Sequence, residues 1–146
     1  MLETFSSIRE LDPALAGTMD VADGMPVFAS FAVDDQGCLL GDGLTIEGAV
    51  VHAEKRGVAS VGVNCCSLEA ADEVLPRLRR AARTPVSVRP NAGDPFMTED
   101  GSIVWPDRDS SFARRCVRWR ATGANLVGCC CGGTPATTAA MSDALS

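Results

Sequence analysis

The residues best suited to chemistry are cysteines that follow short apolar runs at two places in the chain. Cys65 ends the segment Gly62-Val-Asn-Cys65, and Cys129, Cys130 and Cys131 stand consecutively near the end of the sequence. The thiolate is the form of cysteine that binds metals, and soft thiolates favour zinc, copper(I) or iron–sulfur clusters. Cys65 with the adjacent Cys130 and Cys131 would supply three sulfur ligands and leave a fourth position open, as in catalytic zinc sites.

The number and spacing of the cysteines restrict the alternatives. No two of them have C-x-x-C spacing, which counts against a zinc ribbon, a thioredoxin-type redox site and most iron–sulfur patterns. There are seven cysteines, an odd number clustered at predicted strand ends, so a reducing cytoplasm fits better than a disulfide framework. We expect Cys66 and Cys129 to pack away from the ligands, Cys116 to join a helical core stripe, and Cys38 to be an exposed or half-buried free thiol.

Composition and charge exclude several classes of partner. Apolar residues make up 46% of the 146 residues, as in a globular domain. The net charge of −6 gives no electrostatic footprint for nucleic acid. No stretch approaches the ~20 apolar residues of a membrane span, and the first residues lack the pattern of a signal peptide. We therefore expect a cytoplasmic protein with neither nucleic acid nor membrane as a partner.

The elements that must position the cysteines alternate between strands and helices. Apolar runs predict buried strands at residues 26–33, 58–63, 85–88 and 124–127. Helical periodicity covers residues 45–56, 67–82 and 110–122, and Ser7 and Glu10 have capping-box spacing before a further helix. Pro76 predicts a kink or a late start in the second of these three helices. The repetition indicates an α/β fold with a parallel sheet.

The start of the chain and one long loop complete this outline. Residues 1–2 are too short for a strand, although the pattern needs one before the Ser7 helix. We therefore expect an N-terminal strand stub plus about four complete parallel strands, too few to close an eight-stranded barrel. This abrupt start also leads us to expect residues missing upstream of a single domain over residues 1–146. The polar loop at residues 91–109 is long enough to be functional.

A histidine-based catalytic arrangement has little support. His52 is the only histidine, and it falls off the apolar face of its helix, so we expect it to be solvated. A Ser-His-Asp or Cys-His site therefore has no second histidine to draw on.

Several motifs together resemble the zinc-dependent homocysteine S-methyltransferases. They are Gly62-Val-Asn-Cys65, Pro90-Asn-Ala-Gly93, Trp119 and Gly128-Cys-Cys-Cys-Gly-Gly-Thr-Pro135, and Glu3-Thr4 matches a Glu-Thr at an earlier strand end of the family. Three separated motifs in the right order are far more specific than one short pattern. The family includes enzymes using S-methylmethionine, S-adenosylmethionine or betaine, and the homocysteine module of cobalamin-dependent methionine synthase.

The resemblance implies a partial (β/α)8 TIM-type barrel, because the chain corresponds only to the C-terminal half of the family fold. Three positions depart from the family pattern, and one of them is Gly133, which stands in place of the first threonine of the family's Thr-Thr-Pro. Cys129 stands where a glycine is usual, and Thr137 stands where a histidine is common after the Pro135 position.

The resemblance also implies a reaction in methionine biosynthesis. Cys65, Cys130 and Cys131 would bind Zn²⁺, and the homocysteine thiolate would accept a methyl group from a small donor to give methionine. The donor would be a compound such as S-methylmethionine or S-adenosylmethionine. No catalytic residue is implied beyond the metal site.

Three residues outside the metal set are implied as substrate contacts. Glu3 would hold the homocysteine amino group by a charge-assisted pairing. Asn64 and Asn91 would line the pocket at the carboxyl ends of the strands, where barrel active sites are built.

Alternatives from other classes remain open on the sequence. The chain could be a non-catalytic, truncated zinc-binding remnant or an interaction module. It could also be a thiol-based redox protein using residues 129–131, or its cysteines could be small buried packing residues. Self-association or a complementary half-barrel is the expected protein partner. Zinc content under reducing conditions and a methyl-transfer assay separate these readings.

Overall fold

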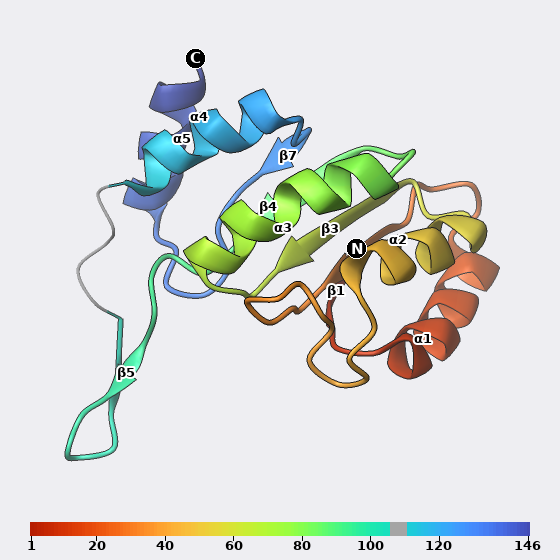
Figure 1. Ribbon diagram of the computed structural model, residues 1–146, viewed down its shortest axis with the longest axis horizontal. Coiled ribbons are helices and arrows are strands. Elements are labelled where there is room, and N and C mark those ends of the chain that lie inside the picture. The colour runs from red at the N-terminus through yellow and green to blue at the C-terminus, as the bar shows by residue number, and fades with distance from the viewer. Residues whose placement is uncertain (106–110) are drawn as a thin grey trace.

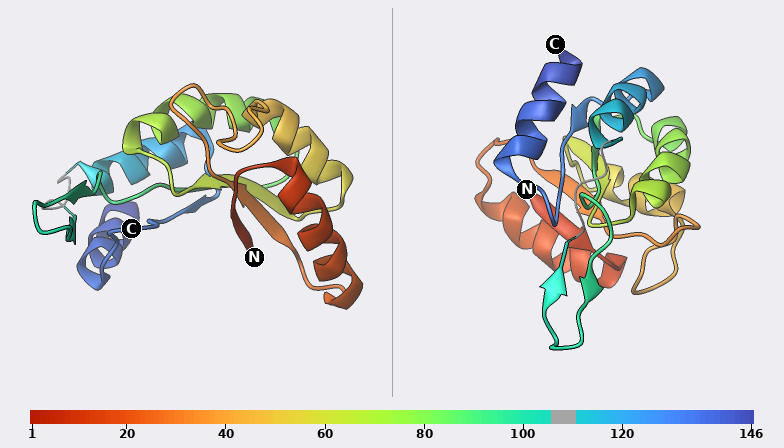
Figure 2. Two further views of the ribbon diagram at one scale, coloured as in Figure 1. Left: turned by 90° about the horizontal axis from the view of Figure 1, so that it is seen from below. Right: turned by 90° about the vertical axis from the view of Figure 1, so that its left-hand side faces the viewer.

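The computed structural model describes residues 1–105 and 111–146 and places five strands side by side in one curved sheet (Figure 1). The elements follow in the order β1 (Leu2–Phe5), α1 (Ile8–Val21), β2 (Phe28–Phe31), α2 (Ile46–Lys55), β3 (Ser60–Asn64), α3 (Leu68–Ala81), β4 (Val86–Arg89), β5 (Phe96–Met97), β6 (Ile103–Val104), α4 (Phe112–Thr122), β7 (Leu126–Val127) and α5 (Pro135–Leu145). Helices α1 to α4 arch over the outer side of the sheet, as Figure 2 shows.

All neighbouring strands of this sheet are parallel, in the order β1-β2-β3-β4-β7. The predicted α/β class, the four strands and the short strand at the start of the chain are therefore confirmed. The outward side chains of the central strands, such as Val61, Val63, Val86 and Val88, are fully buried. They pack with the apolar stripes of the helices into one core, which explains why these strands read as continuous apolar runs.

The inner face of the same strands carries small polar residues. Ser30, Gly62 and Ser87 are direct neighbours across β2, β3 and β4, and each is buried. A Cβ at Gly62 would overlap the Ser87 side chain and carbonyl, so only glycine allows this approach of the two strands. Further along the same face, at the carboxyl ends, lie Asn64 and Arg89.

Polar caps explain where the helices begin. The side chains of Ser7, Thr45 and Ser67 each accept a hydrogen bond from the backbone N–H three residues on. Because Ser67 caps α3, that helix begins at Leu68 and continues through Pro76. The predicted late start at Pro76 is therefore wrong.

The hairpin of β5 and β6 and the helix α5 were not predicted. The loop at residues 91–109 contains an antiparallel hairpin, β5 with β6, which stands away from the body of the molecule (Figure 1). Residues 106–110, which include the predicted first residue of the helix at 110–122, lie outside the described part. Helix α5 packs against α4 and begins with a capping box between Thr134 and Thr137.

His52 differs from the expectation of a solvated side chain. Its Nε2 lies 2.7 Å from Oδ1 of Asp12 on α1, and about a third of the side chain is exposed. Asp12 also accepts a hydrogen bond from Arg56 at 3.1 Å. Because α1 packs beside α2, the polar edge of α2 acquires a partner that periodicity alone does not reveal.

The predictions for the four other cysteines agree with their burial. Cys66 and Cys116 are buried in the core, Cys129 packs against it, and Cys38 is a half-buried free thiol. Among the described residues, no helix is long and apolar enough to cross a membrane.

Candidate metal and substrate site

Two cysteine segments meet at the carboxyl ends of two strands of the same sheet. Cys65 directly follows β3, and Cys130 and Cys131 follow β7 by a few residues, with β4 between the two strands. The backbone of the Pro90 loop joins them. Cys130 N–H donates to the Pro90 carbonyl at 2.7 Å, and Ala92 N–H donates to the Cys131 carbonyl at 2.8 Å. Cys65 N–H in turn donates to the Arg89 carbonyl at 3.3 Å, so the end of β4 and the loop after it connect the two segments.

The three sulfur atoms have the spacing of a metal-binding set. The Sγ atoms of Cys65, Cys130 and Cys131 all lie within 4.8 Å of one another, and those of Cys65 and Cys131 are 3.9 Å apart. Two sulfurs bound tetrahedrally to zinc at about 2.3 Å lie about 3.8 Å apart, so the donor set fits that ion. Cys131 is exposed, while the other two are half-buried, which leaves an open side for a fourth ligand. No other such group occurs among the residues that the structure describes.

Unusual backbone geometry aims these sulfurs. Cys65 has φ = +56°, a left-handed backbone conformation that residues other than glycine rarely adopt. After the cysteines, Gly132 has φ = +75°, and a Cβ there would overlap the indole of Trp105, which packs directly on it. A Cβ at Gly133 would overlap the Cys129 side chain. The two glycines therefore allow a tight turn beneath the ligand pair.

The Cys65 thiol keeps its proton at neutral pH when no cation is present. Burial raises the pKa of Cys65 to about 12, with further increases from the neighbouring Cys130 and Cys131. Burial likewise raises the pKa of Cys66 to about 12. A metal ion bound by Cys65 must displace the proton of that thiol, because the thiolate is the ligand form.

Asn64 connects the cysteine cluster to the start of the chain. The side chain is buried, and its Oδ1 accepts hydrogen bonds from Thr4 N–H at 3.0 Å and Ser30 Oγ at 2.5 Å. Its Nδ2 donates to Thr4 Oγ1 at 2.6 Å and lies 3.8 Å from Cys130 Sγ. Asn64 therefore lies beside the cluster, but its amide is occupied in fixing Thr4, which itself has φ = +64°.

Glu3 lies at the same end of the sheet and is paired with a residue that the sequence did not single out. Its Oε1 forms an ion pair with Nη1 of Arg89, and its side chain is 42% exposed. Arg89 also donates from Nη2 to Ser30 Oγ at 3.3 Å. The sequence could have pointed to Arg89, because this basic residue stands at the end of an apolar strand and directly before Pro90-Asn-Ala-Gly93.

Asn91 is anchored through its backbone. Its N–H donates to the Cys66 carbonyl at 2.9 Å, which ties the loop to the end of β3. Its side-chain Oδ1 is buried without a hydrogen-bond partner among the described residues. A buried acceptor of this kind is costly unless a ligand or water satisfies it.

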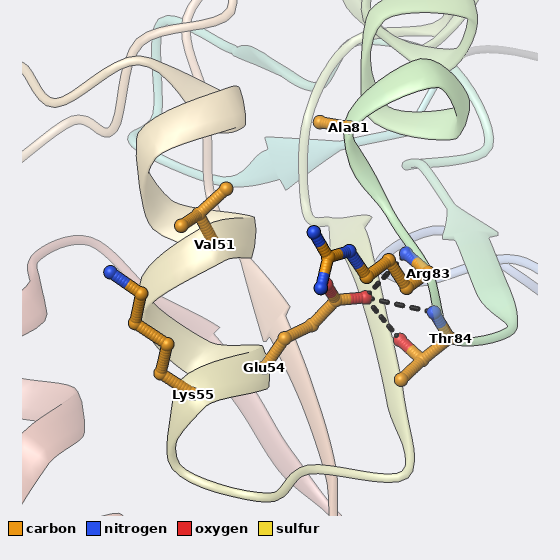
Figure 3. Close-up of a pocket in the computed structure, with 6 residues that line it drawn as sticks. All are labelled: Val51, Glu54, Lys55, Ala81, Arg83 and Thr84. Carbon is orange, nitrogen blue, oxygen red and sulfur yellow. Dashed lines mark hydrogen bonds between the residues drawn. The ribbon is translucent and has the colours of Figure 1, made fainter.

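A surface cavity of about 380 Å³ lies at the opposite end of the sheet, between α2 and the turn before β4 (Figure 3). There Glu54 Oε1 accepts hydrogen bonds from the N–H groups of Arg83 and Thr84 and from Thr84 Oγ1, at 2.7–2.9 Å. Burial by itself would raise the pKa of Glu54, but these hydrogen bonds lower it overall. The carboxylate is thus a clamp between two elements, and the cavity contains none of the three clustered cysteines.

Fold and site together define a segment of a parallel α/β barrel with three clustered thiols that could hold a metal ion at the carboxyl ends of its strands. Residues 1–145 match the homocysteine S-methyltransferase family, and the chain belongs to that family.

The relatives are longer than this chain. Methionine synthase of Mycobacterium tuberculosis is 36% identical over 142 residues, which are 93% of this chain but 12% of that protein. The crystal structure of the homocysteine methyltransferase MmuM from Escherichia coli in its apo form has a TM-score of 0.75 at 25% identity. The match covers 97% of this chain and 48% of the MmuM chain. The chain therefore spans less than half the length of these relatives, and the partial TIM-type barrel is confirmed.

MmuM has also been crystallised with metal. The match to the metallated form covers 97% of this chain and 43% of the MmuM chain, with a TM-score of 0.72 and 26% identity.

Proposed function

We propose that this chain is the homocysteine-binding part of a homocysteine S-methyltransferase, with Cys65, Cys130 and Cys131 as the ligands of Zn²⁺. The observation that carries the proposal is the spacing of the three Sγ atoms, 3.9 Å between Cys65 and Cys131 and within 4.8 Å overall. When bound, zinc would keep the homocysteine sulfur in its deprotonated, nucleophilic form at neutral pH. That sulfur would take a methyl group from a small donor, such as S-methylmethionine or S-adenosylmethionine, to give methionine.

The polypeptide would bind and orient the substrate. Glu3 would accept a hydrogen bond from the homocysteine ammonium group, for which its exposed carboxylate is suited. Asn64 would keep the Glu3–Thr4 strand end at a fixed distance from Cys130. Asn91 would contribute a buried acceptor from the loop that joins the cysteine segments. Such positioning supplies much of the rate increase when two small molecules must meet in line.

Single serine substitutions test the metal assignment. Cys65→Ser, Cys130→Ser and Cys131→Ser should each lower the zinc content measured after purification under reducing conditions, whereas Cys116→Ser should retain it. Cys116 is the matched control because it is buried in the helical core and is not one of the three clustered cysteines. Unchanged zinc content in both the Cys130 and Cys131 variants would exclude the proposed site.

A second measurement separates an enzyme from a zinc-binding remnant. Methionine formation from homocysteine should be followed with each candidate donor, on this chain and on the chain together with a complementary half-barrel. Such a half-barrel is the proposed protein partner, because β1 and β7 are each paired on one side only among the described residues. Zinc binding without methyl transfer in either case would favour the non-catalytic alternative. We also propose the cytoplasm as the location, because reduced thiols require a reducing compartment.

A further inference from the structure

We propose that Arg89 recognises the carboxylate of homocysteine, so that Glu3 and Arg89 together select an amino acid rather than any small thiol. This inference rests on the proposed function and names a specificity-determining residue within it. Zwitterionic amino acids carry an ammonium and a carboxylate on one carbon. An adjacent carboxylate and guanidinium in the protein match that pair of charges.

The position of Arg89 places its side chain on the face that leads to the cysteines. Arg89 is the last residue of β4 and the direct neighbour of Asn64 across the sheet. Gly128, just before the cysteine segment, lets the side chain pass, because a Cβ there would stand only 3.2 Å from Arg89 Cγ. The guanidinium is linked through Ser30 Oγ to Oδ1 of Asn64, whose Nδ2 lies 3.8 Å from Cys130 Sγ. One hydroxyl and one amide thus separate the guanidinium from a sulfur of the cluster.

The hydrogen-bonding capacity of Arg89 is only partly used. A guanidinium has five N–H donors. Among the described residues, Arg89 pairs with Glu3 through Nη1 and makes a long 3.3 Å contact from Nη2 to Ser30 Oγ. Its Nε is buried and has no hydrogen-bond partner. A buried, unpaired donor on a charged group is costly, and a ligand carboxylate is the acceptor whose planar geometry fits a guanidinium.

The charges of the site favour a zwitterion at this place. Three cysteine thiolates around a divalent cation carry one net negative charge, and Glu3 adds another. Arg89 is the cation that contacts Glu3. A substrate carboxylate placed on Arg89 therefore avoids direct repulsion by Glu3 and by the cysteine thiolates. The substrate ammonium would then replace Arg89 as the partner that neutralises Glu3. In a simpler role, Arg89 would hold Glu3 in place without touching substrate. Its substitution would then weaken the binding of every thiol that carries an ammonium group, with or without a carboxylate.

Three thiols distinguish the two roles. Homocysteine carries both charged groups, 3-aminopropane-1-thiol lacks the carboxylate, and 4-mercaptobutanoate lacks the ammonium. Their binding to the cobalt(II)-substituted chain can be followed by the thiolate-to-cobalt absorption, which reports binding without methyl transfer. Arg89→Gln should weaken homocysteine and 4-mercaptobutanoate by at least about tenfold, the loss expected for a charge-assisted hydrogen bond. The same variant should leave 3-aminopropane-1-thiol within about twofold of the parent chain.

Two further variants complete the experiment. Glu3→Gln should show the opposite pattern, with loss for the two ammonium-bearing thiols and little change for 4-mercaptobutanoate. Arg56→Gln is the matched control, because that arginine caps the carboxyl end of α2 and contacts Asp12, away from the cluster. It should alter the affinity of none of the three thiols. Cobalt content and the circular dichroism of each variant verify that the fold and the metal site persist.

The outcomes separate this inference from the proposed function. Equal weakening of homocysteine and 3-aminopropane-1-thiol in Arg89→Gln would overturn the carboxylate role and leave Arg89 as a positioning residue for Glu3. Unchanged binding of all three thiols would overturn both roles of Arg89 while the proposed function stands. If no thiol perturbs the cobalt spectrum of the parent chain, the proposed function fails, and this inference fails with it.

Discussion

Cys65 and Cys131 are 66 positions apart in the sequence, and their Sγ atoms lie 3.9 Å apart at the carboxyl ends of β3 and β7. Because thiols must lose their protons to bind a metal, zinc uptake by the metal-free chain should release protons and should tighten as pH rises. Calorimetric titrations of zinc in buffers of different ionisation enthalpy measure the number released. Binding without proton release would show that the ligands are not these thiols.

Asn64→Ala should destabilise the chain and loosen the strand end that carries Glu3. The substitution removes an amide that bonds Thr4 and Ser30, and it deprives the buried Ser30 hydroxyl of this acceptor. The expected loss in unfolding free energy is about 1–3 kcal/mol. Urea unfolding measures it, with Ser102→Ala on the exposed hairpin as a control that should change little. A variant as stable as the parent would contradict the role assigned to Asn64.

Gly62→Ala should be strongly destabilising, because the new Cβ overlaps the Ser87 side chain and carbonyl on the adjacent strand. Forced overpacking typically costs about 1–3 kcal/mol, and backbone contact places this site at the upper end. Gly17 is the matched control. It lies inside α1 with no atom within 4 Å of an added Cβ, so Gly17→Ala should stabilise by about 0.5–1 kcal/mol. Opposite signs for the two variants in thermal or urea unfolding are the expected result.

Glu54→Gln should make the chain less stable at neutral pH by roughly 1 kcal/mol, because the carboxylate accepts three hydrogen bonds and its exposure limits their strength. The pKa of Glu54 in the folded chain is lowered from the model-compound value of 4.5. Its stabilising contribution is therefore complete above pH 4.5 and disappears as pH falls through the lower, folded pKa. The difference between parent and variant should shrink on acidification. A difference independent of pH would exclude the ionised clamp.

The chain alone should self-associate and show little methyltransferase activity. Among the described residues, β1 and β7 each have a free edge, and the hairpin exposes Phe96, Met97 and Ile103 at 53%, 72% and 70%. Free parallel edges and exposed apolar side chains both promote association. Light scattering of purified residues 1–146 measures the oligomeric state, and methionine formation measures turnover. A monomer with robust turnover would contradict this prediction.

The sequence predicted the strands and the cysteine positions because both depend on local signals. Continuous apolar runs mark buried strands. Cys65 directly follows one such strand, and Cys130 follows another after Gly128 and Cys129. In a parallel sheet the carboxyl ends converge, so residues after neighbouring strands meet without further information. The predicted late start of α3 failed because the Ser67 cap and the burial of the apolar stripe from Leu68 to Leu78 together offset the cost of Pro76 within the helix.

Other features depend on contacts that the sequence does not display. Strands β5 and β6 have two residues each, too few for any periodicity, and α5 is rich in alanine and threonine without a clear apolar stripe. The role of Arg89 appears only when β4 brings it beside Asn64 and Glu3 comes from the start of the chain. The left-handed backbone of Cys65 likewise arises from the tertiary arrangement, since cysteine has no local preference for it.

That backbone conformation has a consequence for how such a sequence changes over evolutionary time. A residue other than glycine, asparagine or aspartate at φ = +56° costs of order 1–3 kcal/mol, so folding alone favours glycine or asparagine at position 65. Only the use of the sulfur opposes that drift. A descendant released from binding metal should therefore lose Cys65 before Cys116, whose burial gives it a second reason to persist. Position 65 thus serves as a marker of whether the ancestral chemistry is still under selection.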